Sequence, residues 1–475
     1  MTAVSKWLLR DDTVRTSGDR ATHTYVIGQP GTGKSRALES WVMQDIQAGR
    51  GVGVIDPHGD LFRNLILRLS SMPQVWERIV IIDPCDRNWV TSFNPLEAVA
   101  DYSQERLSLF LTSIIGKIWN LDLASAPRTM WLLSNTFLAL SNLHLTLLHL
   151  PKFLLDRDHR ESLVPRLTNP SALSFFQHEY PRSPAAAHQW ASPVLNKIGN
   201  LIFDPDISLM LAGRSRVAFR EILDRQLILL VNLPKGTIGE GVSALMGAFI
   251  VAHIQKAALA RANSMYRRPF YLYLDEFQNY TTDNIRDVLS ESRKYALSMT
   301  LVHQYLEQLE PDIRSALLNT AGAIACFRVG YQDGYQLAKE IFPDSDFLGT
   351  AQGQDRLIAD PIFSHGFTER TDGASWEGLA ESLSGLAFRE FWHKQRGVRR
   401  PTKQRTFDMP LPTNTNDVRG DMCSLVATSA RLYSRSKSAV QREVAGYNLH
   451  ASGNNGASGE ARPTDVGEEI PFWGV

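Results

Sequence analysis

Eight consecutive residues near the N-terminus have the types and spacing of a phosphate-binding loop. They match the pattern G-x-x-x-x-G-K-[ST] and are Gly28, Gln29, Pro30, Gly31, Thr32, Gly33, Lys34 and Ser35. Glycines let the backbone wrap closely around phosphates, so that N–H groups and a following helix N-terminus face the anion. Lys34 would reach the β- and γ-phosphates, and the Ser35 hydroxyl would bind Mg²⁺. Because a strand-like run precedes the loop and a helix-like run follows it, we predict a nucleoside triphosphate site rather than a turn that binds nothing.

A pair of carboxylates later in the chain supplies what the phosphate loop lacks for hydrolysis. Asp275 and Glu276 follow the apolar run 270–274. At the tip of a buried strand, Asp275 is placed to hold Mg²⁺ through its waters, and Glu276 can orient and deprotonate the attacking water. A buried strand can also end in acidic residues without a catalytic role, but the phosphate loop favours the catalytic interpretation. We therefore predict ATP and Mg²⁺ as cofactors, with Ser35 and Asp275 at the metal.

Three further polar residues are candidates for the reaction itself. A predicted strand over 297–302 stops before Gln304, whose amide could contact both the γ-phosphate and the attacking water as a sensor. A hydrophilic strand end is the alternative. Arg293 and Arg328 are candidates for the arginine finger, which in ring ATPases comes from the adjacent subunit. The alternative for each arginine is a surface salt bridge.

The elements that must position these residues alternate between strands and helices. The predicted strands are 22–27, 51–55, 78–82, 226–232, 269–274, 297–302 and 322–329. Continuous apolar runs of this kind indicate strands buried on both faces, as in a parallel sheet covered by helices. Helices are predicted over 36–48, 242–261 and 282–295. The fold class is therefore α/β.

A long block without strand alternation separates the phosphate loop from the carboxylate pair. Its clearest helical segments are 101–120, 127–141, 146–157 and 187–202. The uncharged stretch 130–150 is too polar to span a membrane, and we predict two amphipathic helices with a break near Ser141 and Asn142. The predicted domains are the first part of an ATPase domain (1–100), an all-α insertion (101–211), the second part of the ATPase domain (212–410) and a flexible tail (411–475).

Composition limits the classes of partner and the compartment. The 475-residue chain has 50 basic and 50 acidic residues, so contact with a polyanion would have to be local. Three widely separated cysteines fit no metal spacing and suit a reducing compartment. The first residues lack the apolar core of a secretory signal, and we predict a cytoplasmic location.

Two local features could bind partners. A basic segment follows the aromatic residues Phe388, Phe391 and Trp392, and its cations are Lys394, Arg396, Arg399, Arg400, Lys403 and Arg405. Basic charge beside aromatics is typical of nucleic-acid contact, although most charge runs are solvated surface. The segment 467–475 is acidic and then apolar, which fits a docking peptide for a protein partner or the incidental end of a tail.

An ordered set of further motifs resembles a known family. Asp56-Pro57-His58-Gly59-Asp60 closes the strand after the phosphate loop, and the later blocks are 93–96, 232–236, 275–279, 292–295, 303–306 and 327–330. Over residues 20–345 the chain is similar to the HerA/FtsK superfamily of DNA-pumping ATPases, above all to TraG-type coupling ATPases of conjugation and type IV secretion and their HerA-like soluble relatives.

The resemblance implies a RecA-like motor domain with an all-α insertion, assembled as a hexameric ring. ATP sites would lie between subunits, and DNA would pass through the central channel. The resemblance assigns no role to Asp56 and His58. Membrane-anchored coupling proteins usually have an amino-terminal transmembrane hairpin, which this sequence lacks, so we expect a relative without such an anchor that a partner recruits to a membrane complex. The alternative is a ring ATPase that moves or regulates a protein, as a secretion motor or a nuclease-associated defence ATPase.

Overall fold

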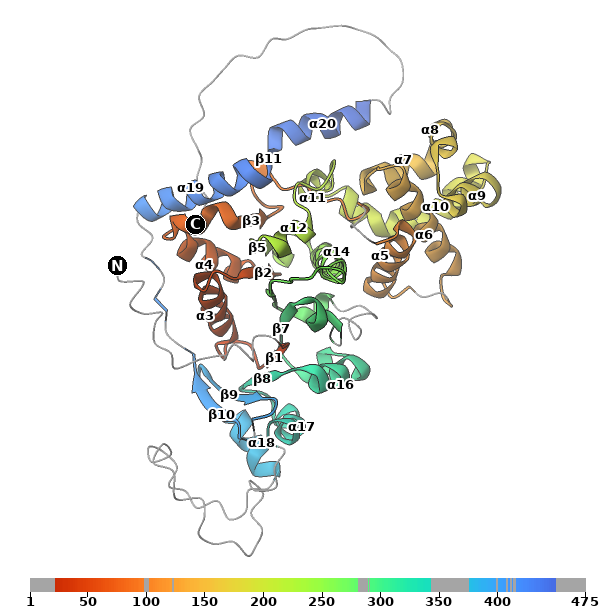
Figure 1. The fold of residues 1–475 in the computed structure, drawn as a ribbon. Helices are drawn as coiled ribbons and strands as arrows, with labels where there is room; N and C mark the ends of the chain where they lie inside the picture. The colour runs from red at the N-terminus through yellow and green to blue at the C-terminus, as the bar shows by residue number, and fades with distance from the viewer. Residues whose placement is uncertain are drawn as a thin grey trace, which may run out of the picture.

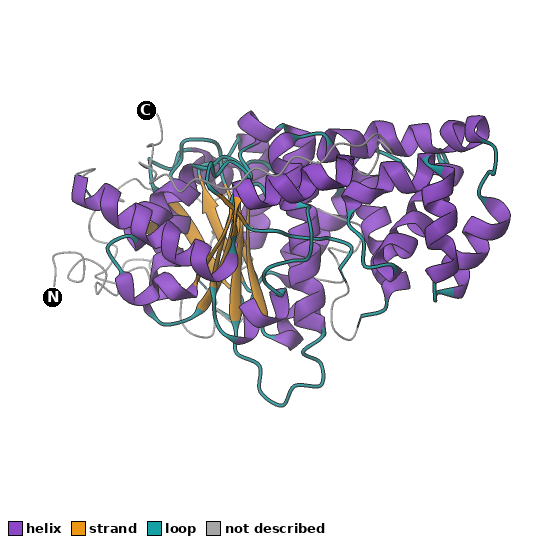
Figure 2. Cartoon of the chain, turned by 90° about the horizontal axis from the view of Figure 1, so that it is seen from above, coloured by secondary structure: helices purple, strands orange, loops and turns teal. Residues whose placement is uncertain are grey.

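A nine-stranded sheet forms the centre of the computed structural model, with the strand order β10-β9-β8-β1-β7-β6-β2-β5-β3. The structure describes residues 22–97, 102–121, 124–280, 289, 291–342, 376–398, 400–406, 409–410, 412 and 416–449. The strands are β1 (Thr24–Ile27), β2 (Gly51–Asp56), β3 (Ile79–Ile82), β5 (Ile228–Asn232), β6 (Phe270–Leu274), β7 (Leu297–His303), β8 (Ala323–Phe327), β9 (Glu390–Gln395) and β10 (Thr402–Arg405). Figure 1 shows the arrangement along the chain, and Figure 2 shows helices on both faces of the sheet.

The strands from β8 to β3 are parallel, whereas β9 and β10 form an antiparallel hairpin against β8. All seven strands predicted from apolar runs are present, within two residues of their predicted bounds. Their side chains alternate between two separate cores: Val54 packs with one cluster, and the next residue, Ile55, packs with the other. Burial on both faces explains why these strands read as continuous apolar runs, and it confirms the α/β class.

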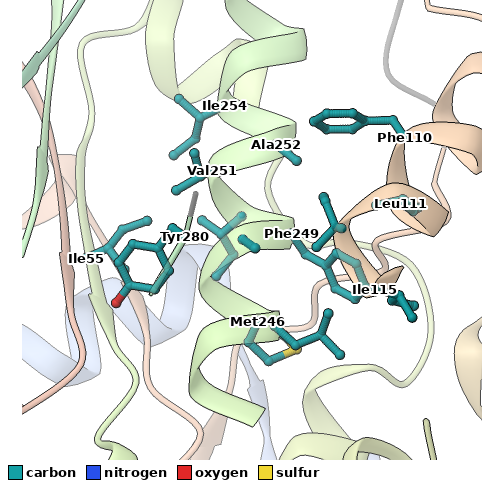
Figure 3. Close-up of a cluster of buried hydrophobic side chains, with 14 of the residues drawn as sticks. Ile55, Phe110, Leu111, Ile115, Met246, Phe249, Val251, Ala252, Ile254 and Tyr280 are labelled. Carbon is teal, nitrogen blue, oxygen red and sulfur yellow. The ribbon is translucent and has the colours of Figure 1, made fainter. Parts of the chain in front are cut away.

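Helices cover each face of the parallel strands. On one face, α3 (Lys34–Gln47) and α4 (Asp60–Leu69) contribute buried residues to the same core as Val54. On the other face lies α14 (Glu240–Leu259), which also packs on α5 (Gln104–Ile118), as Figure 3 shows. By length and hydropathy α14 could cross a membrane, but 83% of its apolar window is buried inside the protein. Its apolar sequence is therefore explained by its position between the sheet and α5.

Residues 104–210 form a group of helices that Figure 1 shows to one side of the sheet. The helices are α5, α6 (Pro127–Asn142), α7 (Leu150–Leu155), α8 (Arg157–Leu163), α9 (Pro170–Ser174), α10 (Pro184–Ile202) and α11 (Pro205–Met210). The chain bends by 119° between α6 and the segment Leu147–Leu155. The predicted break near Ser141 and Asn142 is therefore confirmed.

Shorter elements connect these parts. The 3-10 helices are η1 (Pro73–Arg78), η2 (Leu147–His149), η3 (Val164–Arg166), η5 (Phe277–Tyr280), η6 (Ser292–Tyr295) and η7 (Leu306–Gln308), and η4 (Phe175–Glu179) is a π-helix turn. The remaining short helices are α12 (Phe219–Asp224), α13 (Lys235–Ile238), α16 (Pro311–Thr320), α17 (Tyr331–Ile341) and α18 (Trp376–Ser384).

The predicted flexible tail from residue 411 is wrong for residues 416–449. This segment forms α19 (Asn416–Tyr433), β11 (Arg435–Ser436) and α20 (Lys437–Leu449), and β11 pairs with β4 (Trp89–Val90). The Tyr433 hydroxyl donates to the Glu77 carbonyl at 2.8 Å, and Leu425 and Val440 are fully buried. The segment is mostly small and polar, so composition did not reveal the few apolar residues that dock it. The predicted docking peptide 467–475 lies outside the described residues.

Two other predictions need correction or fall outside the described chain. Within the helix predicted over 282–295, residues 282–288 and 290 are not described, and Ser292–Tyr295 forms a single 3-10 turn. Arg328 does not lie in an apolar strand, because β8 ends at Phe327. The arginine therefore begins the loop at the end of the strand, where a charged side chain can reach solvent without crossing the core.

Gly247 of α14 is expected to tolerate no side chain. A Cβ at this position would overlap the ring of Tyr280, which follows the carboxylate pair at the end of β6. Gly247→Ala should therefore destabilise the protein by about 1–3 kcal/mol through overpacking. Gly241→Ala in the same helix is the control, because a Cβ there would have no atom within 4 Å. Thermal unfolding of both variants tests this, and an equal or higher melting temperature for Gly247→Ala would contradict it.

Candidate functional site

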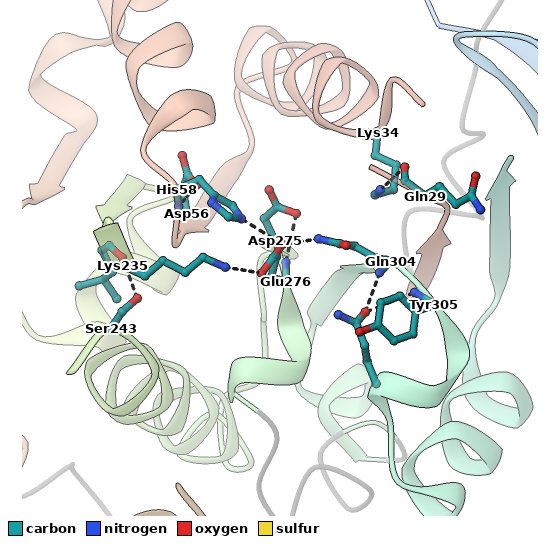
Figure 4. A network of polar contacts seen from close by, with 12 residues as sticks. Gln29, Lys34, Asp56, His58, Lys235, Ser243, Asp275, Glu276, Gln304 and Tyr305 are labelled. Carbon is teal, nitrogen blue, oxygen red and sulfur yellow. Dashed lines mark hydrogen bonds and ion pairs between the residues drawn. The ribbon is translucent and has the colours of Figure 1, made fainter. Parts of the chain in front are cut away.

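The strand order brings the predicted site residues to one edge of the sheet. The phosphate loop follows β1, Gln304 follows β7, and Asp275 and Glu276 follow β6. Because β7 pairs with β1 on one side and with β6 on the other, its carboxyl end lies between the loop and the carboxylates. Figure 4 shows these side chains together with residues that follow β2 and β5. Ligands of open parallel sheets bind at this carboxyl edge.

The phosphate loop has the backbone of an anion-binding turn. Gly31 and Gly33 have positive φ angles of 72° and 107°, which only glycine adopts without strain. The helix α3 begins at Lys34, so its N-terminus opens onto the loop. The Lys34 ammonium donates to the carbonyls of Gly28 and Gln29, the second at 2.9 Å. Burial lowers the pKa of Lys34 to about 8, although Asp275 and Glu276 oppose the shift.

The hydroxyl of Ser35 and the carboxylate of Asp275 are oxygen groups suited to a magnesium ion. Ser35 is exposed at the start of α3, and Asp275 is partly exposed at the end of β6. Burial, together with the neighbouring Asp56 and Glu276, raises the pKa of Asp275 to about 6, although His58 and Lys34 oppose the shift. Hydroxyl and carboxylate oxygens are ligands that Mg²⁺ accepts. Among the described residues no group of three or more His, Cys, Asp or Glu could hold a metal, so water and phosphate would supply the other ligands.

The carboxylate of Glu276 is held by three donors. Its Oε1 accepts from Gln304 Nε2 at 2.6 Å and lies 3.0 Å from His58 Nε2. Its Oε2 accepts from Lys235 Nζ at 3.0 Å. The hydrogen bond from His58 and the ammonium of Lys235 lower the pKa of Glu276 to about 2 despite its burial. Glu276 has a positive φ of 47°, so the backbone is strained where the side chain is held.

Two of these donors had no predicted role. His58 and Lys235 belong to motifs that were matched to the family, but neither was predicted as a site residue. The His58 amide donates to Asp56 Oδ1 at 2.8 Å, and Asp56 Oδ2 accepts from the Phe62 amide at 2.9 Å, so Asp56 fixes the turn into α4. The Lys235 amide donates to the Pro57 carbonyl at 2.9 Å. Each residue lies within three positions of the end of a parallel strand, which is the sequence signal that could have placed it at this edge.

Gln304 lies where the sensor prediction requires. Its amide group contacts Glu276, and its backbone N–H donates to Gln308 Oε1 at 2.9 Å. The preceding His303 is buried, contacts the Tyr25 hydroxyl at 2.6 Å, and has its pKa lowered to about 3 by burial. The end of β7 is therefore fixed from both sides. The role of Gln304 as a sensor stays a prediction.

The two arginine candidates lie at opposite ends of the sheet. Arg328 directly follows β8, and its carbonyl accepts from the Gln29 amide at 2.8 Å, so its backbone adjoins the phosphate loop. Arg293 is exposed on η6, which precedes β7 and therefore lies at the opposite edge from the loop. The role of either arginine as a finger stays a prediction.

The predicted DNA-binding cations lie on the hairpin β9–β10, and several contact their own chain. Lys394 Nζ donates to the Val398 carbonyl at 2.8 Å, Arg396 Nη1 donates to the Asn319 carbonyl at 2.9 Å, and Lys403 pairs with Glu390 at 2.8 Å. The remaining described cations of this set, Arg400 and Arg405, are exposed, and Arg399 lies outside the described residues. DNA contact by this segment stays a prediction.

Comparison with known proteins shows likeness in structure. No model of a known protein family matches the chain, and no curated protein matches it. The plasmid coupling protein TrwB in complex with GDPNP matches at a TM-score of 0.58 and 15% identity, over 84% of this chain and 89% of that chain. The unbound form of the bacterial conjugative coupling protein TrwBdeltaN70 matches at a TM-score of 0.59 and 15% identity, over 84% of this chain and 88% of that chain. VirB4 of Thermoanaerobacter pseudethanolicus matches at a TM-score of 0.50 and 13% identity, over 82% of this chain and 90% of that chain.

At these identities the likeness shows the fold. The chain therefore has the α/β, RecA-like P-loop fold of the conjugative coupling protein TrwB and of VirB4.

Proposed function

We propose that this chain is an ATP-hydrolysing motor that assembles as a hexameric ring and translocates DNA, as in conjugative transfer, type IV coupling or HerA-type DNA processing. The observation that carries the proposal is the contact between Gln304 and Glu276 on a strand end that lies between the phosphate loop and Asp275. ATP and Mg²⁺ are the proposed cofactors. The likeness to TrwB supports them, because TrwB has been solved with ADP and Mg²⁺ and with ADPNP.

The residues divide the chemistry between them. Lys34 would bind the β- and γ-phosphates, and Ser35 and Asp275 would hold Mg²⁺, which would neutralise charge on the phosphoryl group. Glu276 takes a proton from water, whose oxygen attacks the γ-phosphorus as the bond to the bridging oxygen breaks, giving ADP and phosphate. Gln304 connects the water with the γ-phosphate. Arg293 or Arg328 from a neighbouring subunit stabilises the charge that develops.

The contacts of Glu276 describe a resting state. A carboxylate with a pKa near 2 is a weak base, and both of its oxygens are already engaged by donors. To accept a proton from water, Glu276 must lose contact with Lys235 or His58, and either loss raises its pKa toward the usual range. Hydrolysis would thus depend on a rearrangement at the ends of β2 and β5, where these two residues lie.

The proposal includes partners and location. The chain would act in the cytoplasm, recruited to a membrane complex by a partner that could bind the segment 467–475. Lys394, Arg396, Arg399, Arg400, Lys403 and Arg405 would contact DNA. One observation favours a second candidate, a ring ATPase that moves or regulates a protein: three of these basic side chains already bind groups of their own chain.

ATP hydrolysis is expected to depend on the two halves of the site in different ways. Lys34→Ala should abolish binding of MgATP, because the phosphates lose their cation. Glu276→Gln should keep binding and slow hydrolysis by about 10²–10⁴-fold, the usual contribution of a general base. Phosphate release measured with and without DNA tests both, with Glu161→Gln on α8 as the control. Wild-type protein that hydrolyses no ATP in either condition would overturn the proposed function.

Lys235→Met is expected to raise the rate of hydrolysis without DNA. The change removes one donor from Glu276. An ion pair with a partly exposed lysine contributes up to about 1 kcal/mol, which corresponds to roughly fivefold in rate. DNA should then stimulate the variant less than the wild type. Lys339→Met, on α17, is the control. A basal rate below that of the wild type would show that Lys235 supports hydrolysis and does not restrain it.

DNA binding should depend on salt through the exposed hairpin cations. Replacing Arg400 and Arg405 by Gln should lower the slope of log affinity against log salt concentration by about 1.4–1.8, since each phosphate contact contributes about 0.7–0.9. Fluorescence anisotropy with single- and double-stranded oligonucleotides measures the slope. Replacing the exposed Arg157 and Arg225 by Gln, away from the hairpin, is the control. Equal slopes for all three proteins would favour a protein cargo.

A further inference from the structure

We propose that Phe388 and Arg389, which precede β9, form the base-binding part of the nucleotide site and hold a purine ring. The inference rests on the proposed function, because it requires that the phosphate loop binds a nucleotide. Neither residue was predicted to take part in nucleotide binding.

These residues contact the phosphate loop directly. The Arg389 amide donates to the Thr32 carbonyl at 3.0 Å. The stem of Arg389 also packs over Gly33: a Cβ at Gly33 would lie 3.1 Å from Arg389 Cγ and 3.2 Å from its Cα. Gly33 is therefore required for this approach as well as for its positive φ. The segment before β9 is part of the wall of the phosphate site.

The segment lies on the side of the loop where the base must leave. The groups that act on the γ-phosphate, Gln304 and Glu276, follow β7 and β6, which lie on one side of β1. On the other side of β1 lie β8 and then β9, and Arg389 directly precedes β9. A γ-phosphate beside the carboxylates would leave the ribose and base to extend away from them, toward this second side. Phe388 and Arg389 are placed to meet them there.

The chemistry of the pair suits a flat aromatic ligand. Phe388 is 55% exposed, and the Arg389 guanidinium carbon lies 5.1 Å from the centroid of its ring. Aromatic rings and guanidinium groups both offer flat surfaces on which bases stack. A purine has the larger ring system and would gain more from such stacking than a pyrimidine. The expected ligand is a purine nucleoside triphosphate.

Packing of β9 and hydrogen bonds of the neighbouring backbone fix the position of Phe388 and Arg389. Phe391 of β9 stacks on Phe327 of β8 with ring centroids 4.8 Å apart, and it meets Trp41 of α3 edge to face at 6.2 Å. The Arg389 carbonyl accepts from the Thr406 amide at 2.9 Å, and Arg389 has a positive φ of 68°. A non-glycine residue keeps such a conformation only where its surroundings fix it, as is common at ligand sites. The segment is therefore positioned before any nucleotide binds.

The experiment compares a nucleotide with its phosphate chain alone. Binding of MgATP and of magnesium tripolyphosphate is measured by titration calorimetry for wild type, Phe388→Ala, Phe388→Tyr and Arg389→Ala. Phe388→Ala should weaken MgATP at least fivefold, the lower end of what base stacking contributes, and leave tripolyphosphate unchanged. Phe388→Tyr should retain binding, since the ring remains. The preference for ATP over CTP should fall in Phe388→Ala. Phe203→Ala is the matched control, because Phe203 is 78% exposed after α10.

Each other outcome overturns the inference. An affinity of Phe388→Ala for MgATP within twofold of wild type would show that the ring does not hold the base. Equal weakening of MgATP and tripolyphosphate would show that the segment only supports the loop. Wild-type protein that binds neither ligand would instead overturn the proposed function, and this inference with it.

Discussion

The position of β7 between β1 and β6 is the constraint on which the candidate site depends. Neighbouring strands are about 4.8 Å apart, so one intervening strand separates the phosphate loop from Asp275 by roughly 10 Å. A gap of this size accommodates a phosphate chain and a metal ion, and Gln304 projects into it from the end of β7. If β1 and β6 paired directly, neither the gap nor the polar side chain between the two halves would exist.

The sheet also supports a cluster of charged residues at the carboxyl ends of its strands, although its core is apolar. Its central strands are buried on both faces, and α14 packs between the sheet and α5, so apolar packing holds the strands whose ends carry the polar residues. The carboxylates of Asp56, Asp275 and Glu276 lie near one another at these ends, and burial together with Asp56 and Glu276 raises the pKa of Asp275. The ammonium groups of Lys34 and Lys235 lie near them, as does the imidazole of His58, whose pKa is raised by its hydrogen bond to Glu276. The negative charge is thus partly compensated, and a bound metal ion would complete the compensation.

Some elements of the fold and of the candidate site could be predicted from the sequence because their residue patterns have few structural explanations. The phosphate loop, the carboxylate pair and the apolar strands could be predicted, because glycine spacing and continuous apolar runs have few alternatives. The contacts of Lys235 could not, since they depend on which strands are neighbours, and strand order is a property of the whole sheet. The helices over 416–449 were missed for a different reason: a few apolar residues such as Leu425 and Val440 dock a segment whose average composition is polar.

Backbone strain marks both ends of the proposed nucleotide site. Glu276 and Arg389 are non-glycine residues with positive φ, and they lie on opposite sides of the phosphate loop. Each is fixed by contacts beyond its own segment: Glu276 by donors from three other loops, and Arg389 by Thr32 and Thr406. Such conformations cost about 1–3 kcal/mol each. Among the described residues, positive φ also occurs at Asn120, His144, Gln226 and Ala296, away from the phosphate loop, so strain alone does not identify a ligand site. Glu276 and Arg389 differ from these residues because they lie beside the phosphate loop, where their neighbours fix them next to the space that a nucleotide would occupy.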